Sequence, residues 1–282
     1  MEKLSGGQLR EILEQCGFSF SKSLGQNFLT DLRILNKIAE DAAIHKDACV
    51  LEVGPGAGTL TRVLAERAQK VVAVEIDASL LPVLEQTLKG IENITVLNAD
   101  ILKLDLEKLY QEHLQSGFLL VANLPYYITT PIIMKLLESG LPFASATVLV
   151  QREVAQRMAA RPNTPEYGAL SCMVQYYTKP VLCSRIAPNC FYPAPKVESQ
   201  VVRLERLAQP PVKVKNQETL FKLIHSAFAM RRKTLANNII AAFNLDRVQA
   251  EDIILKANID VRIRGEALSL EQFAQLANLI DE

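Results

Sequence analysis

A glycine-rich loop stands out in the first third of the chain because its spacing can place a ligand against the backbone. The stretch LEVGPGAGTLT (51–61) carries Gly54, Gly56 and Gly58 between an apolar run and a helix-like run. Glycine permits the tight turn and leaves no Cβ in the way of a ligand, and the helix that follows offers unpaired N–H groups. The spacing departs from the G-x-G-x-x-G fingerprint of dinucleotide sites, because Thr59 stands at the sixth position.

Three acidic residues accompany the loop and indicate a cationic ligand. Glu52 precedes Gly54 by two residues and would repel a pyrophosphate. It suits S-adenosylmethionine, whose sulfonium and ammonium are both positive. Glu75 ends the next apolar run, where a carboxylate can accept hydrogen bonds from ribose hydroxyls, and Asp100 ends the third, where it can bind the adenine amino group. Alone, each has a plainer interpretation as a surface or capping residue; together they predict an S-adenosylmethionine site.

The tetrapeptide Asn123, Leu124, Pro125 and Tyr126 ends a fourth apolar run, at the same predicted edge. The amino group of adenine is a poor nucleophile, because its lone pair is delocalised into the ring. Two acceptors, the Asn123 side-chain oxygen and the Leu124 carbonyl, can hold its hydrogens, while Pro125 removes a competing N–H. Tyr126 can stack on an extruded base. Catalysis would then rest on positioning and electrostatics. Taken alone, the stretch is equally a proline turn with core tyrosines.

Short apolar runs alternate with helix-like runs through the first 160 residues. Strands are predicted at 48–53, 70–76, 93–99, 117–123 and 145–151, and helices at 59–68, 78–90, 130–140 and 152–160. This alternation predicts a parallel sheet covered on both faces. Two further strands are predicted at 171–187 and 199–207 with no helix between them, one of them antiparallel to the rest. A proline-containing linker is predicted at 208–217 and a small helical domain at 218–282.

The charges are unevenly distributed although the net charge is zero. Residues 150–235 carry 14 Lys and Arg against 5 Asp and Glu, and acidic stretches flank them. This basic middle either meets a polyanion or is an uneven solvated surface. Arg231, Arg232 and Lys233 are consecutive in a helix-like stretch, so they are predicted to face solvent on a helix and to contact phosphates.

Other features exclude several classes of protein. No apolar run is long enough to span a membrane, and the N-terminus lacks a signal-peptide core. The 5 cysteines include no C-x-x-C pair, which predicts neither disulfides nor a zinc site and favours a reduced, cytoplasmic protein. The 3 histidines fall in no motif, which argues against a histidine general base.

Four stretches together resemble the ribosomal RNA adenine N6-dimethyltransferase family: KSLGQNFLTD (22–31), LEVGPGAGTLT (51–61), VANLPYYITTP (121–131) and NCFYPAPKVESQVV (189–202). The resemblance runs from residue 16 to about residue 207 and extends through the helical tail. It is closest to the bacterial members that dimethylate two adjacent adenosines near the 3′ end of small-subunit ribosomal RNA. The glycine loop alone is not specific, whereas the four stretches together are.

The resemblance implies a seven-stranded, Rossmann-like sheet of an S-adenosylmethionine-dependent methyltransferase at 1–207, with its last strand antiparallel and an N-terminal segment that covers the cofactor. A small all-helical domain would follow. It implies catalytic roles for Asn123 to Tyr126, with Phe191 stacked on the other face of the target adenine. It implies contacts to the cofactor from Gln26, Asn27, Leu29, Gly54, Gly56, Glu75, Asp100 and Asn123. The roles of Gln26, Asn27, Leu29 and Phe191 come from the resemblance alone.

Partners follow from the same resemblance: small-subunit ribosomal RNA in a partly assembled particle, with no membrane and no metal. Three alternatives stay open. One is a large-subunit adenine methylase of the antibiotic-resistance type. The stretch CFYPAPKVES and the helical tail favour the small-subunit enzyme over this alternative. Another is a ribosome-assembly factor whose binding matters more than its chemistry. The third, a small-molecule methyltransferase, is disfavoured by the basic middle. The RNA positions, the order of methylation and the oligomeric state are not predicted.

Overall fold

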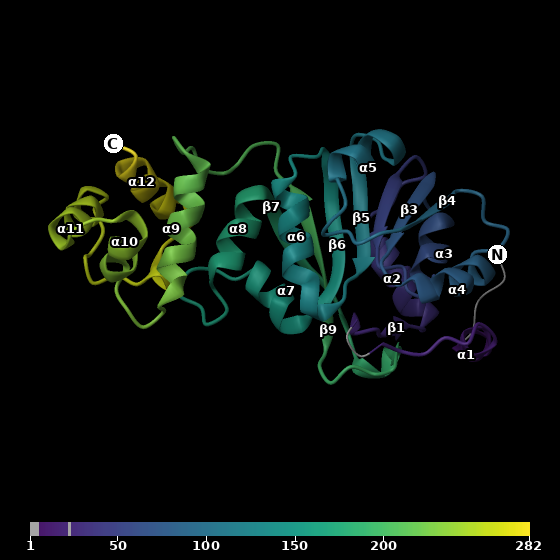
Figure 1. Cartoon of the computed structure of the whole chain (residues 1–282). Helices are drawn as coiled ribbons and strands as arrows, with labels where there is room; N and C mark the ends of the chain where they lie inside the picture. The colour runs from purple at the N-terminus through teal and green to yellow at the C-terminus, as the bar shows by residue number, and fades with distance from the viewer. Residues whose placement is uncertain (1–5, 22–23) are drawn as a thin grey trace. The chain divides into compact units, whose positions relative to one another are not determined.

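The computed structural model describes residues 6–21 and 24–282, so Lys22 and Ser23 of the N-terminal motif lie outside the described residues. Its centre is a seven-stranded sheet with the strand order β4-β3-β2-β5-β6-β9-β7 (Figure 1). A separate two-stranded sheet pairs β1 with β8. The strands are β1 Phe28–Leu29, β2 Cys49–Val53, β3 Lys70–Glu75, β4 Ile94–Asn98, β5 Phe118–Asn123, β6 Phe143–Gln151, β7 Thr178–Ile186, β8 Phe191–Tyr192 and β9 Ser199–Arg206.

The central strands are parallel and buried. β2 pairs in parallel with β3 and β5, β3 with β4, and β5 with β6. All five residues of β2 are buried, as expected for a strand covered on both faces. β9, the last strand, runs antiparallel to β6. These pairings confirm the predicted fold class, a seven-stranded Rossmann-like sheet with its last strand antiparallel.

The order in which successive strands are added to the sheet reverses at its middle, between the parallel strands β2 and β5. From β2 the chain passes through α3 (Thr59–Ala65) to β3, whereas from β5 it passes through α6 (Thr129–Glu138) to β6 on the other side. Because parallel crossovers are right-handed, the two helices cover opposite faces of the sheet. The crevice outside the carboxyl ends of such strands is where open α/β sheets bind ligands. The fold therefore places a site at the ends of β2 and β5.

The remaining helices are α1 Gly6–Gln15, α2 Leu32–Asp41, α4 Leu81–Thr87, α5 Leu106–His113, α7 Arg152–Met158, α8 Ala169–Tyr177, α9 Gln217–Ala229, α10 Leu235–Phe243, α11 Arg247–Lys256 and α12 Leu270–Ile280. One core cluster joins residues of α2, such as Leu35 and Ile38, with residues of α3, such as Val63 and Leu64, on one face of the sheet. None of the helices within the described residues is long and apolar enough to cross a membrane.

The chain divides into two compact units. One comprises Met1–Ala155 with Val181–Arg206, and the other comprises Gln156–Pro180 with Leu207–Glu282. The second unit thus contains the helical tail predicted at 218–282 and also α8, which the predicted boundary at residue 207 assigns to the sheet domain. Within this unit the rings of Tyr176 and Phe221 meet edge to face, with centroids 5.1 Å apart. This contact joins α8 to α9.

The predicted strand at 171–187 is wrong in its first half. Residues 169–177 form α8, and only Thr178–Ile186 is a strand. A short apolar run rich in β-branched and aromatic residues does not by itself distinguish a strand from a buried helix. Leu170, Met173 and Val174 are all buried at helical spacing, so packing within the second unit decides the conformation.

The predicted helical position of Arg231, Arg232 and Lys233 is also wrong. α9 ends at Ala229, where Met230 leaves the helical region with φ −127° and ψ 78°, and the three residues form a turn before α10. All three are exposed, as predicted. Arg231 donates a hydrogen bond to the carbonyl of Pro165 and lies 3.7 Å from the Glu266 carboxylate.

Candidate active site

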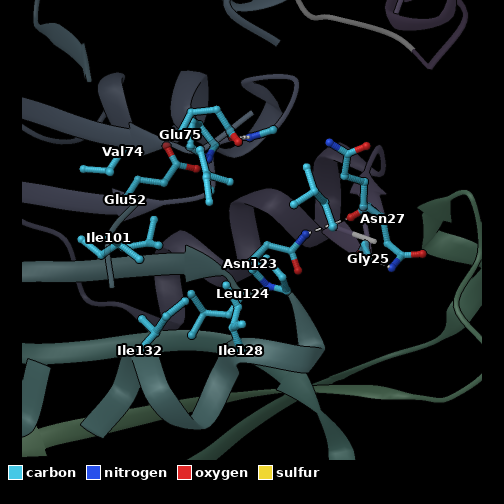
Figure 2. A pocket seen from close by; sticks show the side chains of 18 of the residues that line it. Gly25, Asn27, Glu52, Val74, Glu75, Ile101, Asn123, Leu124, Ile128 and Ile132 are labelled. Atoms are coloured by element: carbon cyan, nitrogen blue, oxygen red, sulfur yellow. Dashed lines mark hydrogen bonds between the residues drawn. The ribbon is translucent and has the colours of Figure 1, made fainter. Parts of the chain in front are cut away.

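A pocket opens at the carboxyl edge of the sheet, at the point between β2 and β5 where the strand order reverses. Its empty space, including the open mouth, is about 940 Å³. The ends of β2, β3 and β5 line it, together with residues 24–29 of the N-terminal segment (Figure 2). Glu52, Glu75 and Asp100 are among its walls, and no Lys, Arg or His is among the described residues that line it. Such a pocket attracts cations and repels phosphates.

The glycine loop and Glu75 hold one another in place. Gly54 and Gly56 have φ values of 70° and 57°, a region that L side chains rarely adopt. Glu75 accepts hydrogen bonds from the backbone N–H of Gly56 at 3.0 Å and of Asp77 at 2.9 Å. Burial raises the pKa of the Glu75 carboxyl, and these backbone hydrogen bonds oppose the rise. Each oxygen keeps a lone pair that can accept a hydroxyl hydrogen from a ligand.

A side chain at Gly56 would disturb the glycine loop. A Cβ there would stand 2.9 Å from the Cε1 atom of Phe28. We expect Gly56→Ala to lower the free energy of unfolding by about 1–3 kcal/mol through steric overlap and backbone strain. Gly90→Ala is the matched control, because Gly90 has φ +79° but nothing within 4 Å of an added Cβ. Denaturant unfolding of both variants measures the difference; equal losses would show that backbone strain alone accounts for the effect at Gly56.

Glu52 is a buried carboxyl group with an unsatisfied oxygen. The residue is 1% exposed, and its Oε2 atom has no hydrogen-bond partner. Burial raises the pKa of Glu52 to about 8; the nearby Thr61 hydroxyl opposes the rise, and the negative charge of Glu75 adds to it. In Figure 2 Glu52 and Glu75 lie beside one another, away from Asn123. An unpaired buried carboxyl in a ligand pocket indicates a ligand group that can pair with it.

Asp100 combines the two roles considered for it. Its Oδ1 atom accepts a hydrogen bond from the backbone N–H of Leu102 at 2.9 Å, which caps the turn after β4. It also lines the pocket. Capping fixes the carboxylate. Its second oxygen lies 3.8 Å from the exposed Lys103 ammonium and has lone pairs left to accept a hydrogen bond from a ligand.

The stretch Asn123 to Tyr126 presents two uncommitted acceptors. The side-chain amide of Asn123 donates a hydrogen bond to the backbone carbonyl of Asn27 at 3.1 Å (Figure 2), which leaves its oxygen without an internal partner. Leu124 donates its N–H to the Leu149 carbonyl at 3.1 Å. No hydrogen bond among the described residues uses the Leu124 carbonyl oxygen. Two acceptors that face a pocket can hold the two hydrogens of an amino group.

Pro125 and Tyr126 are held by the elements around them. The Pro125 carbonyl accepts hydrogen bonds from the N–H of Ile128 at 3.2 Å and from the Thr129 hydroxyl at 3.1 Å, which ties the stretch to the start of α6. The Tyr126 hydroxyl lies 2.6 Å from the Ser199 hydroxyl. Burial raises the pKa of Tyr126, so the phenol stays neutral. The half-buried ring lines the pocket.

The N-terminal segment 24–29 is fastened to the pocket at three points. Gln26 donates its amide to the Asp77 carboxylate at 2.7 Å, and the Asn27 carbonyl accepts from Asn123. The Leu29 carbonyl accepts a hydrogen bond from the Thr59 hydroxyl at 2.8 Å. All six residues line the pocket. Gln26, Asn27 and Leu29 therefore lie in the same pocket as the residues predicted from the strand ends.

Phe191 does not line the pocket in this structure. It pairs with Leu29 in the two-stranded sheet, and its side chain is 5% exposed within the core cluster. An apolar ring beside Leu29 and the end of the sheet is favoured by burial. Its predicted stacking on the target adenine would need the ring to leave this position, and it stays a prediction.

Several lining residues are missed by sequence reasoning. Phe28, Ile101, Tyr127, Ile128 and Ile132 are apolar or aromatic members of the wall. No spacing rule marks them, because they come from different elements that only the fold brings together. Tyr127 could have been found, because it is the second tyrosine of the stretch NLPYY. In the structure its side chain is half exposed.

The fold and pocket define a Rossmann-like α/β protein whose site combines a glycine loop with acidic strand ends. The family model described as ribosomal RNA adenine dimethylase matches residues 17–282. The chain therefore belongs to the ribosomal RNA adenine dimethylase family.

Relatives of known name agree with this assignment. The chain is 50% identical over 281 residues to "Ribosomal RNA small subunit methyltransferase A" of Lachnoclostridium phytofermentans, covering 98% of this chain and 96% of the relative. It is 46% identical to the protein of the same name from Alkaliphilus oremlandii, covering 99% and 98%.

Two solved structures are also similar. A dimethyladenosine transferase from Plasmodium falciparum has a TM-score of 0.73 and 25% identity, covering 88% of this chain and 95% of that one. The 23S rRNA methyltransferase ErmE has a TM-score of 0.68 and 30% identity, covering 91% and 100%. Within the described ranges, no group of three or more His, Cys, Asp or Glu is arranged to hold a metal ion.

Proposed function

We propose that the protein transfers methyl groups from S-adenosylmethionine to N6 of two adjacent adenosines near the 3′ end of small-subunit ribosomal RNA. We propose further that it acts in the cytoplasm on a partly assembled particle, late in subunit assembly. The observation that carries the proposal is the pair of uncommitted acceptors at Asn123 and Leu124 in a pocket walled by carboxylates. Family membership supports the substrate class.

The residues of the pocket fit this cofactor. Bound there, it supplies a methyl group on a positively charged sulfur. Glu75 would accept the ribose hydroxyls, and the fixed Asp100 carboxylate would accept the adenine amino group. The backbone of Gly54 and Gly56 approaches without a Cβ. The unsatisfied oxygen of Glu52 supports a cationic ligand and argues against a dinucleotide. Segment 24–29 would cover the bound molecule.

The chemistry assigned to the chain is orientation of the target amino group. The Asn123 oxygen and the Leu124 carbonyl would each accept one of its hydrogens, so that the nitrogen lone pair points at the methyl group. These acceptors also stabilise positive charge that develops on the nitrogen during transfer. The product cation is acidic and loses its proton to water, so no strong base is required. This agrees with the absence of His, Lys and Arg from the described pocket lining.

Tyr126 and Phe191 are assigned to the flat faces of the target base. Stacking is worth about 1–3 kcal/mol per base, so Tyr126→Ala should raise KM for the RNA by roughly 5–150-fold. Tyr126→Phe keeps the ring and loses only the contact with Ser199; it should retain most of the affinity. For Phe191 the variant is Phe191→Leu, which keeps an apolar side chain in the core. If Tyr126→Ala and Phe191→Leu both methylate with the parental KM, the stacking assignment is wrong.

A large-subunit substrate is the second candidate, because ErmE is named a 23S rRNA methyltransferase and shares the fold. The higher identity to relatives named for the small subunit favours the first candidate. Purified small and large subunits from a strain that lacks both methylations separate the two. We expect labelled methyl groups to enter the small subunit and not the large one. Label in the large subunit and not in the small one would show that the substrate is large-subunit RNA.

The turn between α9 and α10 is the proposed contact for the RNA backbone. Arg232 and Lys233 are exposed and form no ion pair with any described residue, whereas Arg231 is committed to Pro165 and Glu266. Two unpaired cations side by side suit phosphate oxygens, which give register without reading sequence.

We expect the double variant Arg232→Glu, Lys233→Glu to weaken binding to small subunits and to lower the salt dependence by about one to two units of slope. Affinity for S-adenosylmethionine should not change. Lys46→Glu, Lys89→Glu is the control with equal charge, since both lysines are exposed in the acidic first part of the chain. Filter binding over a salt series measures both. If the two double variants behave alike, net charge rather than this turn governs RNA binding.

A further inference from the structure

Glu52 lies in the wall of the pocket and favours a cationic ligand. It sits on β2, two residues before the glycine loop, and its carboxyl is almost fully buried. Its Oε2 atom lacks any hydrogen-bond partner. Leaving a buried carboxylate ionised and unpaired is costly. In the empty pocket the group is therefore better accommodated as a neutral acid.

The charged side chains that line the pocket with Glu52 are all negative. Glu75 at the end of β3 lies beside it. Two further carboxylates belong to this edge of the sheet. Asp77 is bonded to Gln26, and Asp100, after β4, is bonded to the Leu102 N–H and lies 3.8 Å from the exposed ammonium of Lys103, which does not line the pocket. From α3 the Thr61 hydroxyl lies close enough to favour the ionised form of Glu52. No lysine, arginine or histidine is among the described residues of the pocket wall.

A positively charged ligand would reverse this balance. A cation beside a carboxyl group favours its ionised form and lowers its pKa, whereas a neutral ligand that displaces water would favour the protonated form. Burial raises the pKa of Glu52 to about 8 in the ligand-free protein. At pH 7 its carboxyl group is therefore mostly protonated and has a proton to release. Its protonation state therefore distinguishes a cationic from a neutral occupant.

We propose that Glu52 is a proton-linked counter-ion for a positive centre of the cofactor: it is neutral in the empty pocket and ionises when the cation binds. This inference rests on the proposed cofactor, S-adenosylmethionine. On binding, the O–H bond of the Glu52 carboxyl breaks and its proton leaves to solvent, while the carboxylate pairs with the cation. Methyl transfer turns the sulfonium into a neutral thioether, so a carboxylate paired with the sulfonium would regain a proton and favour release of the product.

The sign of the pH dependence follows from this linkage. Below pH 8 the acid must lose a proton before it pairs, so affinity for S-adenosylmethionine should rise roughly tenfold per pH unit from pH 6 and level off above 8. In the ligand-free protein the raised pKa acts the other way. Folding favours the protonated form, so the stability contributed by Glu52 falls as the pH rises from its ordinary value toward 8.

Calorimetry at pH 7 in two buffers of different ionisation enthalpy counts the protons released. We expect S-adenosylmethionine to release about one proton from the parent protein and none from Glu52→Gln. Equal counts in the two proteins would overturn the proposal. So would equal affinities of the parent at pH 6 and pH 8, a measurement that does not depend on the folding of the variant.

Two further ligands test which positive centre is involved. S-adenosylhomocysteine keeps the ammonium and lacks the sulfonium. Proton release with both ligands would show that Glu52 pairs with the ammonium, and proton release with S-adenosylmethionine alone would show that it pairs with the sulfonium. 5′-Methylthioadenosine has neither centre, and proton release on its binding would contradict the proposal. If S-adenosylmethionine gives no binding heat and does not compete with a labelled analogue in either protein, it is not the cofactor. That result differs from binding without proton release, which would refute only the role proposed for Glu52.

Discussion

Asn123→Ala should lower turnover by about 10²–10³ while the protein stays folded, because one preorganised hydrogen bond to the reacting group is worth that much in rate. The Asn123 amide is fixed by the Asn27 carbonyl at 3.1 Å, so its oxygen is held in one orientation before the base arrives. Alanine removes that acceptor, and the nitrogen lone pair is then free to stay in conjugation with the adenine ring.

The matched control for this variant is Asn98→Ala. Asn98 also stands at the end of a strand and donates its side-chain amide to a backbone carbonyl, that of Glu75, at 2.8 Å. It does not line the pocket. Single-turnover methylation with saturating cofactor measures the rate in both variants, and circular dichroism reports folding. Parental turnover in folded Asn123→Ala would make the Asn-Leu-Pro-Tyr stretch a turn and nothing more.

Glu75→Gln should weaken S-adenosylmethionine binding by about 1–3 kcal/mol, roughly 5–150-fold, since charged hydrogen bonds to the ribose are lost. Glutamine fills the same space but carries no charge. Burial raises the pKa of Glu75, so its ionised form is costly in the folded protein. Glutamine has one acceptor oxygen, whereas Glu75 accepts from the N–H groups of both Gly56 and Asp77. The hydrogen bond that is lost offsets the relief of the buried charge, so we expect only a small net change in the free energy of unfolding above pH 5, where the unfolded carboxyl is ionised.

The control for Glu75→Gln is Glu85→Gln, which removes the same charge from an exposed position of α4. Equilibrium dialysis of the labelled cofactor gives the affinities, and denaturant titration gives the stabilities. The opposite pattern, an unchanged affinity with a large loss of stability, would mean that Glu75 serves only to hold the glycine loop through Gly56.

The parts of the site that could be predicted from the sequence lie at the ends of strongly apolar strands. The apolar run 49–53 and the glycines after it mark the loop without any knowledge of the fold. Glu75 and Asn123 end two further buried strands, and Asp100 follows the half-buried strand β4. Parallel strands end at one edge, so these side chains meet there by topology alone. The order of the strands and the position of the switch point depend on contacts distant in sequence and could not be predicted this way.

The covering segment and Phe191 could not be found from patterns. β1 and β8 are two residues long, and a two-residue strand has no periodicity to detect. The pairing of Phe28 with Tyr192 and of Leu29 with Phe191 is non-local. Only the resemblance pointed to these residues. In α8, by contrast, the pattern was present but fitted both a strand and a buried helix, and burial against its neighbours in the second unit decided between them.

The central claim is that this pocket dimethylates two neighbouring adenosines of the small subunit, and one measurement tests it most directly. Under-methylated small subunits are incubated with the protein and methyl-labelled S-adenosylmethionine, and the modified nucleosides of the RNA are mapped by nuclease digestion and mass spectrometry. We predict N6,N6-dimethyladenosine at two adjacent positions near the 3′ end, with no label when Asn123→Ala replaces the parent for the same short incubation. The account would be contradicted by label on another nucleoside or on the large-subunit RNA. It would also be contradicted if the protein binds the cofactor but labels no RNA at all.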